Sequence, residues 1–108
     1  MVDTPDGAYY AVIFSAKRTN RDEPQYDEMV QRMLALATQQ PGFIGFESTH
    51  GAEGFEITVS YWRDIPSIRG WRQHADHLVA QAKGRSTWYE RYRVRVCRVE
   101  QTYGFQGL

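Results

Sequence analysis

The stretch FEITVSYWRDIPSIRGWRQHADH, residues 55–77, decides the fold. Its first eight residues alternate between two sets, which predicts a strand with two different faces. The odd-numbered set is Phe55, Ile57, Val59 and Tyr61, and the even-numbered set is Glu56, Thr58, Ser60 and Trp62. Pro66 then fits the first turn of a helix, where a missing N–H is tolerated. Apolar side chains recur after it at the spacing of one helix face: Ile68, Trp71, Ala75 and Leu78.

The other segments repeat this pairing of strands with a helix. The elements predicted along the chain are strand 9–15, helix 25–39, strand 43–50, turn 51–54, strand 55–62, helix 65–81 and strand 92–103. This order predicts an α+β fold of the ferredoxin-like βαββαβ type, a four-stranded antiparallel sheet with both helices on one face. Residues 1–8 are predicted to form a flexible lead-in, and residues 9–108 a single domain.

Apolar residues on both faces of strand 9–15 leave one sheet face without a helix to cover it. We expect a second copy of the chain to cover that face, and therefore a homodimer. With 13 basic and 13 acidic residues the chain has no net charge. Nucleic acid and anionic membrane surfaces, which attract surplus Lys and Arg, are therefore not expected as partners.

The chain also carries few signals for a particular compartment. It has one cysteine, Cys97, and no apolar run near the roughly 20 residues that span a bilayer. The N-terminal residues lack the basic and apolar regions of a signal peptide. These features predict a cytoplasmic protein.

Two histidines, His74 and His77, lie three residues apart on the predicted second helix. An imidazole titrates near neutral pH, so either one is a candidate general base. The alternative is a pair of surface or hydrogen-bonded structural side chains. A metal site needs three or four ligands, and no nearby cysteine or paired carboxylates complete one, so no metal site is predicted.

Aromatic residues form the second candidate set. Trp62, Trp71, Trp88, Tyr89 and Tyr92 are either core or the walls of a cavity for a flat aromatic ligand, on which such rings stack. Arg95 belongs to a row of arginines on the last strand. It either pairs with Glu47, Glu56 or Glu100 across strands or subunits, or faces inward and stabilises a phenolate.

Five segments together resemble the antibiotic biosynthesis monooxygenase domain family: YYAVIFSAKR, QPGFIGFES, GFEITVSYWRD, HADHLVAQAKGR and WYERYRVRVCRVE. The resemblance implies a dimeric α/β barrel with a ligand between the sheet and the helices of each subunit. It also implies a monooxygenase that needs neither flavin nor metal and acts on a small phenolic or quinol compound. Under it, His74 or His77 is the base, Trp71 and Trp88 stack on the ring, Trp62 also contributes to substrate binding, and Arg95 or Tyr92 holds the anion.

Two alternatives stay open. The haem-degrading branch of the family has an asparagine on the first strand, a tryptophan early in the second helix and a histidine ligand ten residues later. Trp71 matches the tryptophan, but Gln81 stands at the histidine position and the first strand has no asparagine. His74 or His77 is a substitute ligand on the same helix, displaced by about 6 to 10 Å along its axis. The other alternative is a non-catalytic dimer that binds a small ligand or serves in a stress response.

Overall fold

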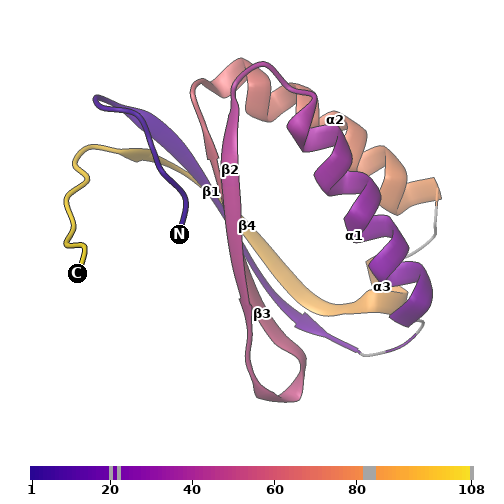
Figure 1. The fold of residues 1–108 in the computed structure, drawn as a ribbon. Coiled ribbons are helices and arrows are strands. Elements are labelled where there is room, and N and C mark those ends of the chain that lie inside the picture. The colour runs from indigo at the N-terminus through magenta and orange to yellow at the C-terminus, as the bar shows by residue number, and fades with distance from the viewer. Residues whose placement is uncertain (20, 22, 82–84, 108) are drawn as a thin grey trace.

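The computed structural model describes residues 1–19, 21, 23–81 and 85–107 (Figure 1). Four strands and three α-helices follow in the order β1 (Tyr9–Arg18), α1 (Glu23–Thr38), β2 (Phe43–His50), β3 (Phe55–Trp62), α2 (Ile65–Gln81), α3 (Arg85–Trp88) and β4 (Tyr89–Val99). A short 3₁₀ turn, η1 (Ala52–Gly54), closes the hairpin between β2 and β3.

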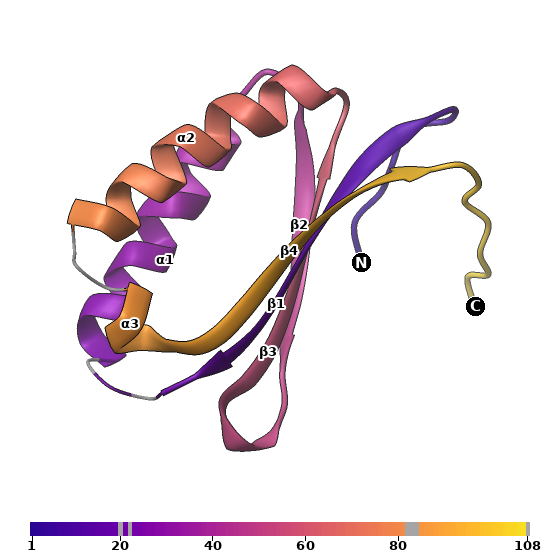
Figure 2. The ribbon, with the colours of Figure 1, turned by 180° about the vertical axis from the view of Figure 1, so that it is seen from behind.

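The four strands form one antiparallel sheet in the order β2-β3-β1-β4. Figures 1 and 2 show α1 and α2 on the same side of this sheet, and both chain termini on the opposite side. We call these the helix side and the outer face. The arrangement confirms the predicted ferredoxin-like fold.

Two predicted strands have different ends in the structure. The first strand continues past Ser15 to Arg18, because β4 supplies partners that far, with a register shift after Lys17. The last strand begins at Tyr89 and ends at Val99 instead of spanning 92–103. Its end is set by pairing, since Val99 lies opposite Tyr9, the first residue of β1. The second helix has its predicted bounds, Ile65–Gln81, and residues 82–84 after it lie outside the described part of the chain.

The start of α2 follows from one side chain. The Asp64 carboxylate accepts a hydrogen bond from the backbone N–H of Ser67 at 2.8 Å, which caps a helix end whose first N–H groups have no partner within the helix. This bond lowers the pKa of Asp64. Gly42 lies beside this cap, because a Cβ built on it would come within 2.8 Å of the Ser67 Cβ.

The core divides into two clusters on the helix side. The Trp62 cluster comprises Val12, Ala37, Trp62 and Ile68, with Tyr10, Phe43, Ile65 and Trp71 packed against it. The Trp88 cluster comprises Tyr26, Met29 and Trp88, with Val30, Met33 and Tyr89 packed against it. Each cluster joins α1 to a different partner: α2 in the first case, and α3 with the start of β4 in the second.

The face of β3 that is buried under the helices is the one with the more polar residues. Its even-numbered residues Glu56, Ser60 and Trp62 are buried on the helix side, whereas Phe55 on the outer face is 47% exposed. The outer face is partly protected by the segments before and after the sheet. The Tyr9 hydroxyl lies 2.6 Å from the Thr102 hydroxyl, and Val2 packs against Gly45. The flexibility predicted for residues 1–8 stays a prediction.

Candidate functional site

The helix side of β4 is only partly covered. Val94 is 37% exposed and Val96 is 45% exposed, although their cross-strand neighbours in β1 are Phe14 and the buried Val12. The backbones of α1 and α2 approach β2 and β3 more closely than β4. We call Val94 and Val96 the valine strip. It is an apolar surface on the same side of the sheet as the two core clusters.

Aromatic rings lie on the same side of the sheet as the valine strip. Trp71 packs against the cluster that contains Val12, the cross-strand neighbour of Val96. Its indole N–H donates to the Met33 carbonyl at 3.0 Å, which fixes the ring between α2 and α1. Phe14, the cross-strand neighbour of Val94, stacks with Tyr92 at a centroid distance of 5.6 Å. A flat apolar ligand on the strip would therefore meet the ring of Tyr92 at the Val94 end.

The predicted aromatic residues divide into two groups. Trp71 and Tyr92 are half-buried, and Tyr92 borders the strip. Trp62 and Trp88 are 0% and 1% exposed, so both are core residues that offer no surface to a ligand. The Trp62 ring packs against the Trp71 ring, with centroids 5.5 Å apart. Trp88 lies in the other cluster, against Tyr26 of α1.

Arg95 lies on the outer face and not on the side of the rings. Its neighbour in β1 is Ile13, and it helps to line an open hollow of about 270 Å³ together with Arg91, Arg93 and Phe55. Within the described part of the chain, Arg95 has no ion-pair partner. The glutamates considered for it are engaged elsewhere: Glu47 accepts from the Tyr61 hydroxyl, Glu56 accepts from the Tyr26 hydroxyl, and Glu100 lies 3.6 Å from Arg98.

His74 and His77 are both exposed on α2. Neither imidazole has a hydrogen-bond or ion-pair partner among the residues that the structure describes. Over the same residues, no three His, Cys, Asp or Glu side chains gather as a metal site requires. A role for either histidine as a base stays a prediction.

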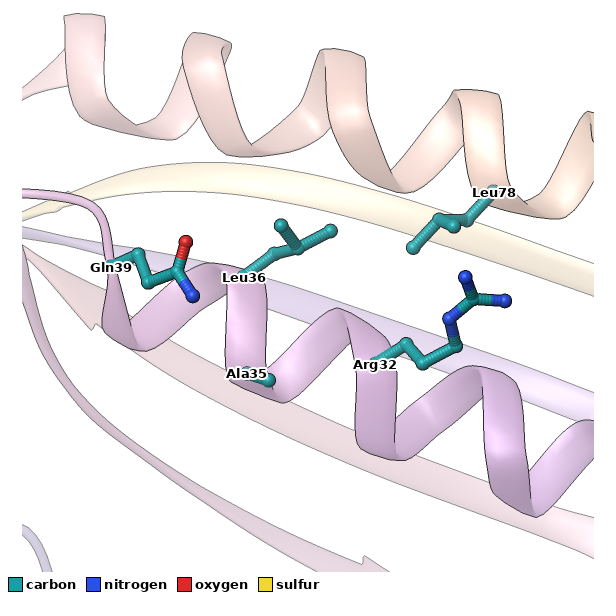
Figure 3. A pocket seen from close by; sticks show the side chains of 5 residues that line it. All are labelled: Arg32, Ala35, Leu36, Gln39 and Leu78. Carbon is teal, nitrogen blue, oxygen red and sulfur yellow. The ribbon is translucent and has the colours of Figure 1, made fainter.

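A second open hollow, of about 340 Å³, lies between α1 and α2 and is lined by Arg32, Ala35, Leu36, Gln39 and Leu78. Figure 3 shows Leu36 and Leu78 extending toward each other across it, with the Arg32 guanidinium beside Leu78. None of the three tryptophans lines it. The hollow is therefore separate from the valine strip.

The structure also brings together a polar group that the sequence patterns did not single out. Glu56 is 4% exposed, and the Tyr26 hydroxyl donates to its Oε1 at 2.5 Å. The Nδ1 atom of His50 lies 3.4 Å from the other oxygen. Burial, with Tyr89 and Glu56 nearby, raises the pKa of Tyr26 far above its ordinary value. A signal was present in the sequence, since Glu56 shares the strand face of Trp62.

The residues at the positions that match the haem-degrading branch do not complete its set, and His74 and His77, the substitute ligands, are exposed on α2. Haem iron needs an axial donor. The position ten residues after Trp71 is Gln81, whose side chain lies outside the described part of the structure. Ser15, the polar residue of the predicted first strand, lines the outer-face hollow and not the valine strip. We therefore derive no step through haem.

Comparison with known proteins gives a consistent result. The sequence model described as antibiotic biosynthesis monooxygenase matches residues 10–83. The chain is 50% identical over 103 residues to the uncharacterized protein YqjZ of Bacillus subtilis. The matched region covers 95% of this chain and 90% of that protein. It is 32% identical over 95 residues to the jasmonate monooxygenase ABM of Pyricularia oryzae, covering 83% of this chain but only 43% of that protein.

The fold also matches solved structures. The structure of SnoaB, a cofactor-independent oxygenase from Streptomyces nogalater, superimposes with a TM-score of 0.61 at 11% identity, over 94% of this chain and 99% of that one. At such low identity the match concerns the fold alone. Among the described residues, no helix is long and apolar enough to cross a membrane.

Proposed function

Because the chain belongs to the antibiotic biosynthesis monooxygenase family, we propose that it is a cofactor-independent monooxygenase acting on a small phenolic or quinol compound. The observation that carries the proposal is the valine strip, an exposed apolar surface that adjoins Tyr92 and lies on the same side of the sheet as Trp71. Such a surface suits a flat ring, which gains free energy by leaving water and by packing against other rings.

The reaction needs little beyond binding and proton removal. Loss of a proton turns a phenol or quinol into an electron-rich anion that reduces O₂ directly. One oxygen atom enters the product and the other leaves as water, with both remaining electrons supplied by the substrate. The protein has to hold the ring, accept the proton and exclude bulk water.

Binding is tested first, without turnover. Trp71 is half-buried, whereas Trp62 and Trp88 are fully buried, so a quinone seated on the strip quenches mainly Trp71 fluorescence. We expect Val96→Gln to weaken binding about tenfold, since a buried amide without a partner costs about 1–3 kcal/mol. Arg91→Gln, a similar change on the opposite face of the same strand, is the control. Equal effects of both changes would remove the strip from the proposal.

Turnover is tested by oxygen uptake with a panel of hydroquinones, and by incorporation of label from ¹⁸O₂. Wild-type protein is expected to consume oxygen above the blank and to place one labelled atom in the product. Binding without uptake for every compound would favour the alternative of a non-catalytic ligand-binding protein.

A homodimer is part of the proposal. Glu47, Val59, Ile13 and Arg95 form one row across the outer face, with Glu47 on the edge strand β2 and Arg95 on the edge strand β4. A two-fold axis parallel to the strands, between two facing sheets, places each Arg95 opposite Glu47 of the partner subunit. The interface is then apolar in the middle and oppositely charged at its edges.

Sedimentation equilibrium tests this arrangement. We expect Glu47→Arg to raise the dimer dissociation constant at least tenfold, because it creates a like-charge contact, and Arg95→Glu to do the same. The double variant restores the pair in reverse and is expected to dimerise again. A double variant that is weaker than either single one would refute the pairing.

We expect the dimer in the cytoplasm. The two histidines of α2, His74 and His77, are further candidates for the base.

A further inference from the structure

The buried carboxylate of Glu56 is one end of a directed line of hydroxyl groups. The Tyr89 hydroxyl donates to the Tyr26 hydroxyl at 3.4 Å, and the Tyr26 hydroxyl donates to Glu56 Oε1 at 2.5 Å. On its other side Glu56 faces the Nδ1 atom of His50 at 3.4 Å, and the His50 side chain is 69% exposed. The line therefore runs from the half-buried Tyr89 to solvent.

The inner end of this line lies at the valine strip. The Tyr89 ring packs edge-on against Phe14 at 5.7 Å and against Tyr92 at 5.3 Å. Phe14 lies opposite Val94 in the sheet. A phenol bound on the strip with its ring near Tyr92 thus has Tyr89 as a neighbour, whereas His74 and His77 are exposed on α2.

The charges around the carboxylate suit proton transfer. Arg18 of β1 lies over the Tyr26 ring, 3.3 Å from its centroid, and His50 of β2, Tyr26 of α1 and Tyr89 of β4 are the other groups that face the cluster. Burial raises the pKa of Tyr89 to about 12 and that of Tyr26 further still. Both tyrosines therefore keep their protons at neutral pH and pass them on without ionising.

We propose that Glu56 is the terminal proton acceptor of the site, and that it receives the substrate proton through Tyr89 and Tyr26 and releases it to solvent through His50. The inference rests on the proposed function and names the base that this function requires. The substrate O–H proton goes to the Tyr89 oxygen, the Tyr89 proton to Tyr26, and the Tyr26 proton to the carboxylate. The products are a bound phenolate, a neutral Glu56 and two intact tyrosines.

The test uses a nitrophenol, which changes colour on ionisation and needs no oxygen. At a pH below its own pKa, wild-type protein is expected to bind the compound as the coloured phenolate. Glu56→Gln keeps an acceptor for Tyr26 but takes no proton, so it is expected to bind the compound as the colourless phenol. Glu90→Gln, the same change at an exposed glutamate beside Tyr89, is the control. Colourless binding by the wild-type protein, or coloured binding by Glu56→Gln, would overturn the proposal.

Turnover supplies the second readout. With any quinol that the wild-type protein oxidises, Glu56→Gln is expected to lower kcat about hundredfold with little change in KM, the size typical of a lost general base. His50→Ala is expected to be restored by added imidazole, which carries protons in its place. A loss confined to His74→Ala or His77→Ala would assign the base to α2 and refute the proposal. Coloured binding without any oxygen uptake would leave the relay standing and remove the monooxygenase function.

Discussion

The hydrogen bond between Tyr26 and Glu56 is expected to be among the strongest polar contributions to stability in this chain. The carboxylate is 4% exposed and Tyr26 is 5% exposed, so water cannot replace either partner. Hydrogen bonds to charged groups contribute about 1.5–3 kcal/mol to stability. Tyr26→Phe removes the donor but keeps the ring, which retains its edge contact with Trp88 and its position under Arg18. Any loss of stability in Tyr26→Phe therefore comes from the missing hydroxyl group.

A double-mutant cycle separates this bond from the remaining contacts. We expect Tyr26→Phe to lower the free energy of unfolding by about 2 kcal/mol, and Glu56→Gln by about 1 kcal/mol because the amide still accepts a weaker bond. The double variant is expected to lose less than the sum of the two, with a coupling energy of about 1–2 kcal/mol. His50→Ala is the comparison, with an expected loss of only about 0–1 kcal/mol because the His50 side chain is 69% exposed.

Guanidinium unfolding, followed by circular dichroism at one fixed protein concentration, measures the four proteins of the cycle and His50→Ala. The fixed concentration matters because self-association adds to apparent stability. A coupling energy below about 0.5 kcal/mol would refute the reasoning, because it would mean that the two side chains contribute independently. It would also weaken the proton relay, which depends on the same contact.

Three further predictions concern the hairpin and the cap of α2. Gly42→Ala is expected to destabilise the protein by about 1–3 kcal/mol in the same unfolding assay, because the new methyl group meets Ser67, whereas Gly104→Ala, which meets nothing within 4 Å, is expected to be neutral. The hydrogen bond to Glu47 raises the pKa of Tyr61 to about 12, so stability is lost as pH rises from about 10 through about 12. Glu47→Gln is expected to move the appearance of tyrosinate absorbance to lower pH, and an unchanged titration would contradict this. The pKa of Asp64 is lowered, so its contribution to stability is present above the ordinary pKa of an aspartate and is lost as pH falls through the lowered pKa. Thermal unfolding at acid pH is expected to show this loss in the wild-type protein but not in Asp64→Asn, and equal losses in both would contradict it.

The secondary structure was largely decided by local pattern. The strand Phe55–Trp62 and the helix Ile65–Gln81 have the bounds that alternation, Pro66 and helical spacing predict. The family was also accessible from the sequence, because it is carried by residue identities at fixed positions. Strand ends were not, since β4 ends where its partner β1 begins, and that partner is far away in the sequence.

The candidate site was predicted only in part. The helical spacing correctly put Trp71 on the inner face of α2, but periodicity has no way to tell a half-buried tryptophan from the fully buried Trp62 and Trp88. For Arg95, the period of two gave its strand neighbours but not which face turns toward the helices. The register with β1 decided that, and it put Arg95 on the outer face.

By itself, then, the sequence determined the order of elements, the family and the two-faced character of β3. Only the tertiary structure decided which face of β3 is covered, and it covered the one with Glu56, Ser60 and Trp62. The physical reason is that burial depends on the partners available. Trp62 fills the space beneath α1 and α2, and Tyr26 supplies the hydrogen bond that lets a carboxylate remain buried, and these groups meet only when segments distant in the sequence pack together.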